Sequence, residues 1–248
     1  CFPHLKIGGP AFANPRKYGP PFLDYLKKTG TPIDFFSWHM YHRRPERISE
    51  DVHVVRQILD EKGFSNVESI LNEWNYNKSW TEKNYYSRYV RRSIKAAAFM
   101  AGVMSECQDG PVDMLMYYDL RPNTTWNGAF MPHTYDILPA YWALYYWAEL
   151  VDFGTQVMSE CTEKDIYTTA ARSADGKLRL LLTRYNEDDS VKDLKEVTVS
   201  VPQGYRLASV RLTDSQKELN RNIDPSGESL TLTLGSNAVA LVEFLPWN

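Results

Sequence analysis

The segment SILNEWN at residues 69–75 decides how the rest of the chain is interpreted. An apolar pair, Ile70 and Leu71, leads directly into a carboxylate, Glu73, that is flanked by amides and an indole. Such a run predicts a buried strand that reaches the rim of a pocket. A carboxylate at a strand end can attack or stabilise an anomeric carbon, and neighbouring amides can donate to sugar hydroxyls. This stretch alone leaves open a plainer alternative, an exposed loop Glu beside a surface Trp.

The first 150 residues alternate between strand and helix patterns. A short segment that ends in a Gly-Gly-Pro turn predicts a strand over 5–11, and two apolar and aromatic runs that end in polar residues predict strands over 33–42 and 114–119. Apolar residues at helical spacing predict helices over 22–28, 49–62, 83–105 and 139–150. This alternation predicts right-handed βαβ units and a parallel sheet. In a TIM barrel, the strand ends where the polar aromatic residues gather form the catalytic face, but a barrel needs eight such units and four are visible.

The pattern changes after about residue 151. Helical spacing disappears, and short alternating segments predict strands over 166–171, 178–185, 197–201, 207–212, 230–234 and 238–244. The pair Asp175-Gly176 is a strong hairpin signal. We therefore expect a small antiparallel β-sandwich, and it contains no catalytic cluster.

Composition excludes several classes of function. The 248 residues carry a formal net charge of −3, so no basic field indicates nucleic acid. No run of about 18 or more apolar residues indicates a membrane span. The three cysteines, Cys1, Cys107 and Cys161, form no CxxC motif, and His39 and His42 have no evident third ligand, so neither a metal nor another cofactor is expected. Seven Trp and 16 Tyr fit a ring-stacking pocket as well as an ordinary core.

Several motifs occur in an order that resembles a known family. They are KIGGPA at 6–11, DFFSWHMY at 34–41, LNEWN at 71–75, YYD at 117–119, TWNGAF at 125–130 and PAY at 139–141. From residue 5 to the end, the chain resembles the second half of family 39 glycoside hydrolases, the β-xylosidases and α-L-iduronidases of the retaining (β/α)8 clan. The resemblance implies an α/β chain: strands 5–8, the C-terminal half of a TIM (β/α)8 barrel, over residues 1–152, and a β-sandwich accessory domain over residues 153–248.

The resemblance also implies roles for individual residues. Glu73 matches the nucleophile of these enzymes, and His39 and Tyr41 match a sixth-strand pair that faces the sugar. The family's acid/base Glu lies in an Asn-Glu-Pro setting on the fourth strand, which would precede Cys1, and this sequence has no such motif. The eighth strand departs from the family, because it has no Trp within it and no acidic pair after it, so the choice of sugar stays open.

Further substrate contacts are expected from the strand ends and the loop that follows them. The candidates are Asn72, Trp74, Tyr117, Asp119, Trp126 and Asn127. Trp74 could be a stacking platform or a core residue, and Asp119 could instead pair with Arg121 to brace the rim. Trp126 and Asn127 lie in a long loop that we expect over the pocket mouth.

These observations predict part of a retaining glycoside hydrolase, exo-acting on xylosides or related glycosides. Its substrate would be an oligosaccharide or glycoside. Half a barrel leaves sheet edges and one barrel face exposed, so we also expect a missing N-terminal half barrel or a second copy of the chain as partner. The alternative is a non-catalytic carbohydrate-binding fragment or a degenerate homologue.

Overall fold

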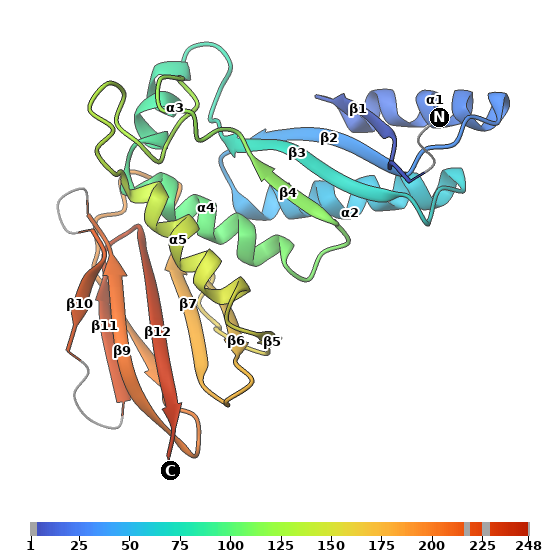
Figure 1. The fold of residues 1–248 in the computed structure, drawn as a ribbon. Coiled ribbons are helices and arrows are strands. Elements are labelled where there is room, and N and C mark those ends of the chain that lie inside the picture. Colours follow the sequence, from blue (N-terminus) through green and yellow to red (C-terminus); the bar gives the residue numbers. More distant parts are fainter. Residues whose placement is uncertain (1–3, 216–218, 225–228, 248) are drawn as a thin grey trace.

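The computed structural model describes residues 4–215, 219–224 and 229–247, and its first half is built on a parallel sheet (Figure 1). The strands run in the order β1-β2-β3-β4, and all three neighbouring pairs are parallel. Their bounds are β1 Gly8–Phe12, β2 Phe35–His42, β3 Glu68–Tyr76 and β4 Met114–Tyr117. The four strands predicted from the sequence are thus present, so their carboxyl ends meet at one edge of the sheet.

The register between β2 and β3 shifts beside the key carboxylate. Trp38 pairs with Leu71, but the next residue along β2, His39, pairs with Glu73. Asn72 is therefore an extra residue on β3, and a bulge of this kind re-aims the side chains next to it. The shift sets Glu73 directly beside His39.

The helices differ in three places from those predicted, including the start of the second, which was predicted at residue 49 and lies at Pro45. The helices are α1 Pro15–Thr29, α2 Pro45–Lys62, α3 Asn84–Arg91, α4 Ile94–Cys107 and α5 Pro139–Val151. The helix predicted over 22–28 begins instead at Pro15, because the Asn14 side chain accepts from the backbone N–H of Lys17 and caps it. The single helix predicted over 83–105 is two helices, because Ser93 is extended and its hydroxyl donates to the Val90 carbonyl.

The second half is antiparallel. One sheet has the order β10-β9-β12-β7-β6-β5, and a second pairs β11 with β8. Their bounds are β5 Thr155–Val157, β6 Ile166–Arg172, β7 Leu178–Arg184, β8 Lys195–Ser200, β9 Tyr205–Thr213, β10 Arg221–Ile223, β11 Ser229–Leu234 and β12 Ala238–Pro246. The predicted strands all occur, with ends displaced by two residues at most, whereas the three-residue strands β5 and β10 were not predicted. The chain is therefore α/β, with parallel and antiparallel sheets.

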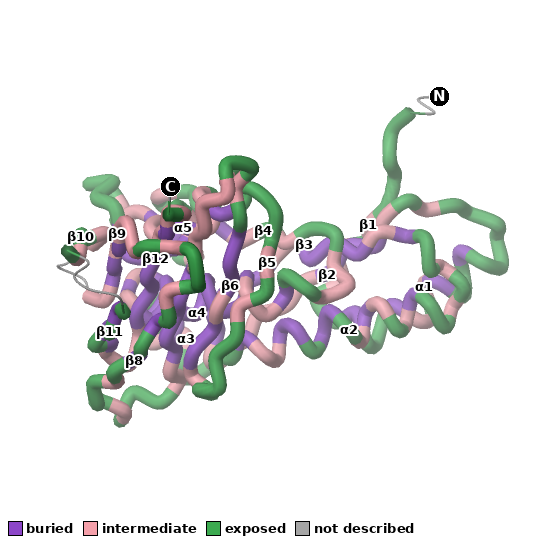
Figure 2. The backbone as a smooth tube through the Cα atoms, turned by 90° about the horizontal axis from the view of Figure 1, so that it is seen from below, coloured by how far each residue is buried: buried purple, intermediate pink, exposed green. Residues whose placement is uncertain are grey.

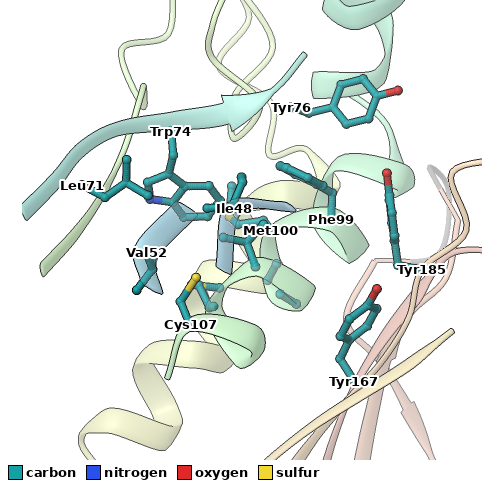
Figure 3. Packing of buried hydrophobic residues seen from close by; sticks show 14 of the residues in the cluster. Ile48, Val52, Leu71, Trp74, Tyr76, Phe99, Met100, Cys107, Tyr167 and Tyr185 are labelled. Carbon is teal, nitrogen blue, oxygen red and sulfur yellow. The ribbon is translucent and has the colours of Figure 1, made fainter. Parts of the chain in front are cut away.

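Helix α4 lies between the two halves (Figures 1 and 2). All its residues are buried except Ile94, Ser105 and Glu106. The Phe99 ring stands edge-on to Tyr76 of β3, with centroids 5.4 Å apart, and lies 5.8 Å from the ring of Tyr185, just after β7 (Figure 3). One continuous hydrophobic cluster therefore spans the parallel sheet, the helices and the inner strands of the antiparallel sheet.

The opposite face of the parallel sheet is open. Helices α1, α2 and α4 pack against one face through residues such as Trp38 and Leu71. The other face bears a hollow whose lining includes Ile70, Met114 and Met116, and both methionines are more than 40 % exposed. Within the described residues, no helix is both long enough and apolar enough to span a bilayer.

Replacing Phe99 should destabilise both halves together. Phe99 is 1 % exposed, so we expect Phe99→Ala to lower the free energy of unfolding by about 3–5 kcal/mol. The control is Tyr89→Ala on α3, where the ring is 72 % exposed and the change should be within about 0.5 kcal/mol. Urea unfolding followed by far- and near-UV circular dichroism would measure both; two separate transitions in the wild-type chain would contradict a shared core.

Glu149 links α5 to the antiparallel sheet. Its carboxylate accepts a bidentate pair of hydrogen bonds from Arg211 of β9 and lies 3.3 Å from a guanidinium nitrogen of Arg179 on β7. The hydrogen bonds from Arg211 are the main reason that the pKa of Glu149 lies below its usual value of 4.5. A pKa that is lower in the folded state than in the unfolded state means that the charged form stabilises the fold.

The stability that Glu149 contributes should therefore depend on pH. It should be fully present above about pH 4.5 and lost as the pH falls through the depressed folded pKa. We expect Glu149→Gln to cost about 1–3 kcal/mol at pH 7. The cost should shrink when urea unfolding is repeated at pH 4 and below. A cost that did not change with pH would mean that packing, and not charge, makes the contact.

Candidate active site

The Glu73 carboxylate is held by two side chains of the neighbouring strand. Tyr41 Oη donates to Glu73 Oε2 at 2.7 Å, and His39 Nδ1 lies 3.2 Å from the same oxygen. Burial and this hydrogen bond raise the pKa of Tyr41, so its hydroxyl stays protonated and remains a donor. Both contacts fall on Oε2, and among the described residues no hydrogen bond goes to Oε1. This arrangement suits a carboxylate that acts while ionised, with one oxygen held and the other available.

The pocket above Glu73 is walled by aromatic rings. It has a volume of about 540 Å³ and is lined by Ala13, His39, Met40, Tyr41, Glu73, Trp80, Tyr118 and Trp126. The ring centroids of Trp80 and Trp126 are 5.7 Å apart, and Tyr41 lies 5.3 Å from Trp80 and 4.8 Å from Trp126. Trp80 is 61 % exposed, so its ring is open to a bound molecule. Aromatic faces around a carboxylate suit a sugar, whose C–H faces stack on rings while its hydroxyls bind polar groups.

Arg91 holds the Trp126 wall in place from beneath. It is almost fully buried, and it donates from Nε to the Tyr76 carbonyl at 3.0 Å and from Nη1 to the Thr125 carbonyl at 3.2 Å. The guanidinium carbon lies 3.8 Å from the Trp126 ring centroid, which is a close cation–π contact. Burial lowers the pKa of Arg91 to about 10, so the side chain remains a cation at neutral pH.

The loop over the rim is organised by two residues that we expected to bind substrate. Asp119 accepts from the Arg121 guanidinium at 2.7 and 2.9 Å and from Thr124 Oγ1 at 2.6 Å. Asn127 is fully buried; its amide donates to the Pro122 and Phe130 carbonyls, and its oxygen accepts from two backbone N–H groups. The polar atoms of both residues therefore shape the loop, which for Asp119 is the alternative of pairing with Arg121 to brace the rim; direct substrate contact by either residue stays a prediction.

Three other predicted contacts also lie outside this pocket. The Trp74 ring is 1 % exposed and points into the core beside Phe99, 6.5 Å away (Figure 3). Tyr117 packs edge-on against Trp74 at 5.3 Å, with its hydroxyl buried. Asn72 lines the hollow on the open face of the sheet instead of the Glu73 pocket. Of the predicted residues, the pocket brings together Glu73, His39, Tyr41 and Trp126.

Two aromatic pocket residues were missed by sequence reasoning, besides Ala13 and Met40. Trp80 follows β3 in a Ser-Trp-Thr turn, and Tyr118 follows β4. The usable signal was position: Tyr118 lies near the carboxyl end of the strand predicted over 114–119, and Trp80 lies in the segment that follows the strand carrying Glu73. Asn75 was also missed as a support, although its amide donates to the Tyr118 and Trp126 carbonyls at 2.6 and 2.9 Å. It ties the end of β3 to both aromatic neighbours.

Similar folds are found among solved structures. The chain aligns over 99 % of its length with 61 % of a glucosidase from Croceicoccus marinus, at 21 % identity and a TM-score of 0.79. It aligns over 99 % with 62 % of a monomeric β-xylosidase from Caulobacter crescentus CB15, at 20 % identity and a TM-score of 0.71. A family 44 xyloglucanase from Paenibacillus polymyxa gives 12 % identity and a TM-score of 0.65, covering 98 % of this chain and 57 % of that one.

The chain has the fold of a glycosidase. It spans about three fifths of the length of the glucosidase and the xylosidase. No family model matches the sequence, and no curated protein matches it either. The similarity therefore establishes the fold of the chain and not its chemistry.

Metal ligands, cysteines and a second cavity are the other features of the described residues that bear on chemistry. Among the described residues, no group of three or more His, Cys, Asp or Glu side chains could hold a metal ion. Cys107 is buried and Cys161 exposed, both as free thiols, and Cys1 lies outside the described residues. A further cavity of about 270 Å³, in the antiparallel half, has a mainly aliphatic lining that includes Leu180 and Val199.

Removing the Asn127 amide should disorder the rim. We expect Asn127→Ala to lower the free energy of unfolding by about 2–4 kcal/mol, because buried backbone groups lose their partners. The tryptophan emission should also shift to longer wavelength as the Trp126 ring becomes more exposed to solvent. The control is Asn123→Ala in the same loop, since Asn123 is exposed and, among the described residues, accepts a single long hydrogen bond, 3.4 Å from the His133 N–H. Equal effects of the two substitutions would contradict the role assigned to Asn127.

Proposed function

We propose that this chain is part of a retaining glycoside hydrolase in which Glu73 is the nucleophile. The observation that carries the proposal is the placement of Glu73 at the carboxyl end of a parallel strand, held by Tyr41 and His39 beneath an aromatic-walled pocket. Glu73 would attack the anomeric carbon and form a covalent glycosyl-enzyme, which water then hydrolyses. Tyr41 would keep Glu73 oriented, while His39, whose Nε2 has no partner in the described part of the chain, would bind a sugar hydroxyl.

The mechanism needs a second carboxyl group about 5–5.5 Å from the first. Among the described residues that line the pocket, Glu73 is the one carboxylate. We therefore propose that the acid/base Glu comes from a segment not contained in this sequence. It would protonate the leaving oxygen first and later activate the water.

The open face of the parallel sheet supports the same arrangement. We propose that β1–β4 and their helices are strands 5–8 of a (β/α)8 barrel, over residues 1–152, and that residues 153–248 form an accessory β-sandwich. The exposed Met114 and Met116 would then face the barrel interior. The missing half barrel, or a second copy of this chain, would cover them.

The proposed substrate is a xyloside or a related glycoside, cleaved from the chain end as in family 39 enzymes. This finer assignment is supported by the order of the motifs in the sequence and by the likeness in fold to a β-xylosidase. A carbohydrate-binding fragment without catalysis is the second candidate. The observation that favours it is the exposed Trp80 beside Trp126, which would bind sugar even without a second carboxylate.

Replacing Glu73 should abolish hydrolysis. The assay is a panel of aryl xyloside, arabinoside, galactoside, glucoside and iduronide, with this chain and with a version that carries its upstream coding sequence. We expect the longer version to turn over at least one glycoside with retained anomeric configuration, and Glu73→Gln to lower kcat on the order of 10³-fold or more.

The matched control is Glu68→Gln, at the opposite end of the same strand. Glu68 pairs with Lys6 and lies outside the Glu73 pocket, so its loss should leave kcat within about twofold. Turnover by the short chain alone would contradict an acid/base group supplied from outside it. Sugar binding that quenches tryptophan emission, with no turnover by either version, would favour the carbohydrate-binding fragment.

A further inference from the structure

A carboxylate of the antiparallel half reaches the strand ends that carry the proposed site. Glu187 follows β7, and its oxygens accept from Tyr76 Oη at 3.0 and 3.3 Å. Glu187 Oε2 also lies 3.0 Å from Tyr185 Oη, whose single proton is shared between this oxygen and the Arg43 carbonyl. Lys78 Nζ lies 3.0 Å and Lys95 Nζ 3.3 Å from the same carboxylate. We call Glu187, Tyr76, Tyr185, Lys78 and Lys95 the Glu187 junction. They come from β3 and the loop after it, from α4, and from the segment after β7.

The Glu187 junction contacts the last pair of residues, or rung, in the ladder between β2 and β3. His42 pairs with Tyr76 on that rung, and the Asn77 N–H donates to the His42 carbonyl at 3.1 Å. Arg43, directly after His42, has its Nε 4.0 Å from Glu187, and its carbonyl accepts from Tyr185 Oη. Both strand ends are therefore tied to the same group of the antiparallel half.

That rung lies three residues from the reacting group. His39 and Glu73 form the paired rung. Between it and the junction, β3 is also held by β4, whose Tyr117 pairs with Trp74, and by the Asn75 amide, whereas the terminal rung itself meets the junction. Strand ends fray, and the amplitude of fraying depends on what holds the terminal rung. A nucleophile must be held within about 0.5 Å of its productive geometry.

The junction is well suited to hold a rung. Glu187 and Lys78 are each 18 % exposed and Lys95 6 %, so their attraction is only partly screened by solvent. Burial raises the pKa of both Tyr76 and Tyr185, which keeps their hydroxyls protonated as donors. Lys95 is held on its other side by Asp189 Oδ1 at 3.0 Å and by the Glu187 carbonyl.

We infer that Glu187 is a positioning residue for Glu73. Through Tyr76 and the backbone at Arg43, it fixes the carboxyl ends of β2 and β3 and so limits the movement of the Glu73 carboxylate relative to Tyr41. The inference rests on the proposed function for its catalytic meaning. It gives the antiparallel half a part in the chemistry, although that half contributes no residue to the pocket.

Simple attachment of the two halves does not require this contact. The shared core around α4 already joins them, and so does Glu149 through Arg211 and Arg179. Glu149 is 21 % exposed at its side chain and Glu187 18 %, so they are matched carboxylates. They differ in that Glu149 contacts neither β2 nor β3.

The first test is amide hydrogen exchange on the wild-type chain, Glu187→Gln and Glu149→Gln. We expect Glu187→Gln to accelerate exchange of peptides covering 41–44 and 73–78 by about tenfold, with β8 and β11 unchanged. Glu149→Gln should leave those two peptides as in wild type. Equal acceleration by both variants, or none by Glu187→Gln, would overturn the inference.

Tyr76→Phe serves where Glu187→Gln fails to fold. It removes a single donor, keeps the charge of Glu187, and should accelerate exchange of the same peptides by about threefold. Unchanged exchange in a folded Tyr76→Phe variant, with no folded Glu187→Gln, would also overturn the inference.

The second test is kinetic, with the version of the chain that carries its upstream coding sequence. We expect Glu187→Gln to lower kcat about tenfold with KM within twofold, because positioning affects the transition state more than binding. Glu149→Gln should leave both values unchanged. An inactive wild type overturns the proposed function, and the exchange test still decides whether the junction fixes the strand ends. Active variants with unchanged kcat overturn the positioning role alone.

Discussion

Helix α4 has almost no face left for water, because the parallel sheet packs against one side of it and β6, β7 and β12 pack against the other. A helix that is apolar all round, as this one is from Ala96 to Met104, can be stable only when it is enclosed. Its small residues allow the close approach: at Gly102, a Cβ atom would come within 3.1 Å of Pro45 and 3.4 Å of the Tyr167 ring. The position of the antiparallel half is therefore set by the core of the parallel half.

This enclosure has a consequence for the rim. Lys95 lies in the first turn of α4 and Tyr76 at the end of β3, and both point to the segment that follows β7. With α4 fixed by hydrophobic packing, the polar groups at its first turn meet Glu187 in one arrangement. Apolar burial attaches the two halves to each other. The charged groups then fix how the two halves are aligned, since their hydrogen bonds depend on both distance and direction while dispersion contacts are not directional.

The sequence predicted the strands well because each shows a clear pattern. In the antiparallel half, apolar and polar residues alternate with a period of two, and in the parallel half the strands are continuous apolar runs. It failed where a single polar residue overrode the pattern. Ser93 interrupts a helical repeat that is otherwise continuous, and Asn14 starts a helix ahead of two prolines. Neither effect depends on periodicity, so a periodic analysis passes over both.

The pocket was predictable in its centre and less so around it. Strand position indicated Glu73, because the carboxyl ends of parallel strands converge, and the resemblance to family 39 enzymes pointed to Glu73, His39 and Tyr41 together. Asn127 looked like a ligand of sugar hydroxyls, yet an asparagine in a turn equally bonds its own backbone, and only the loop's path decides between the two. Trp74 and Trp80 both lie within seven residues of Glu73. Trp74 belongs to β3, where the β-bulge at Asn72 determines which residues face the core, and its ring is buried there, whereas Trp80 lies after the strand and is exposed.

The distribution of charge around Glu73 restricts where a second carboxyl group can stand. Tyr41 and His39 occupy Oε2, and Trp126, backed by Arg91, closes one wall. In the proposed mechanism, a carboxyl group about 5–5.5 Å away would approach Glu73 from the open side of the pocket, beyond the described strands. In a barrel that is the side on which the remaining strands would stand. If an active site were divided between two segments of a protein, one segment would carry a single held carboxylate in a pocket that is open on one side. The Glu73 pocket has this arrangement.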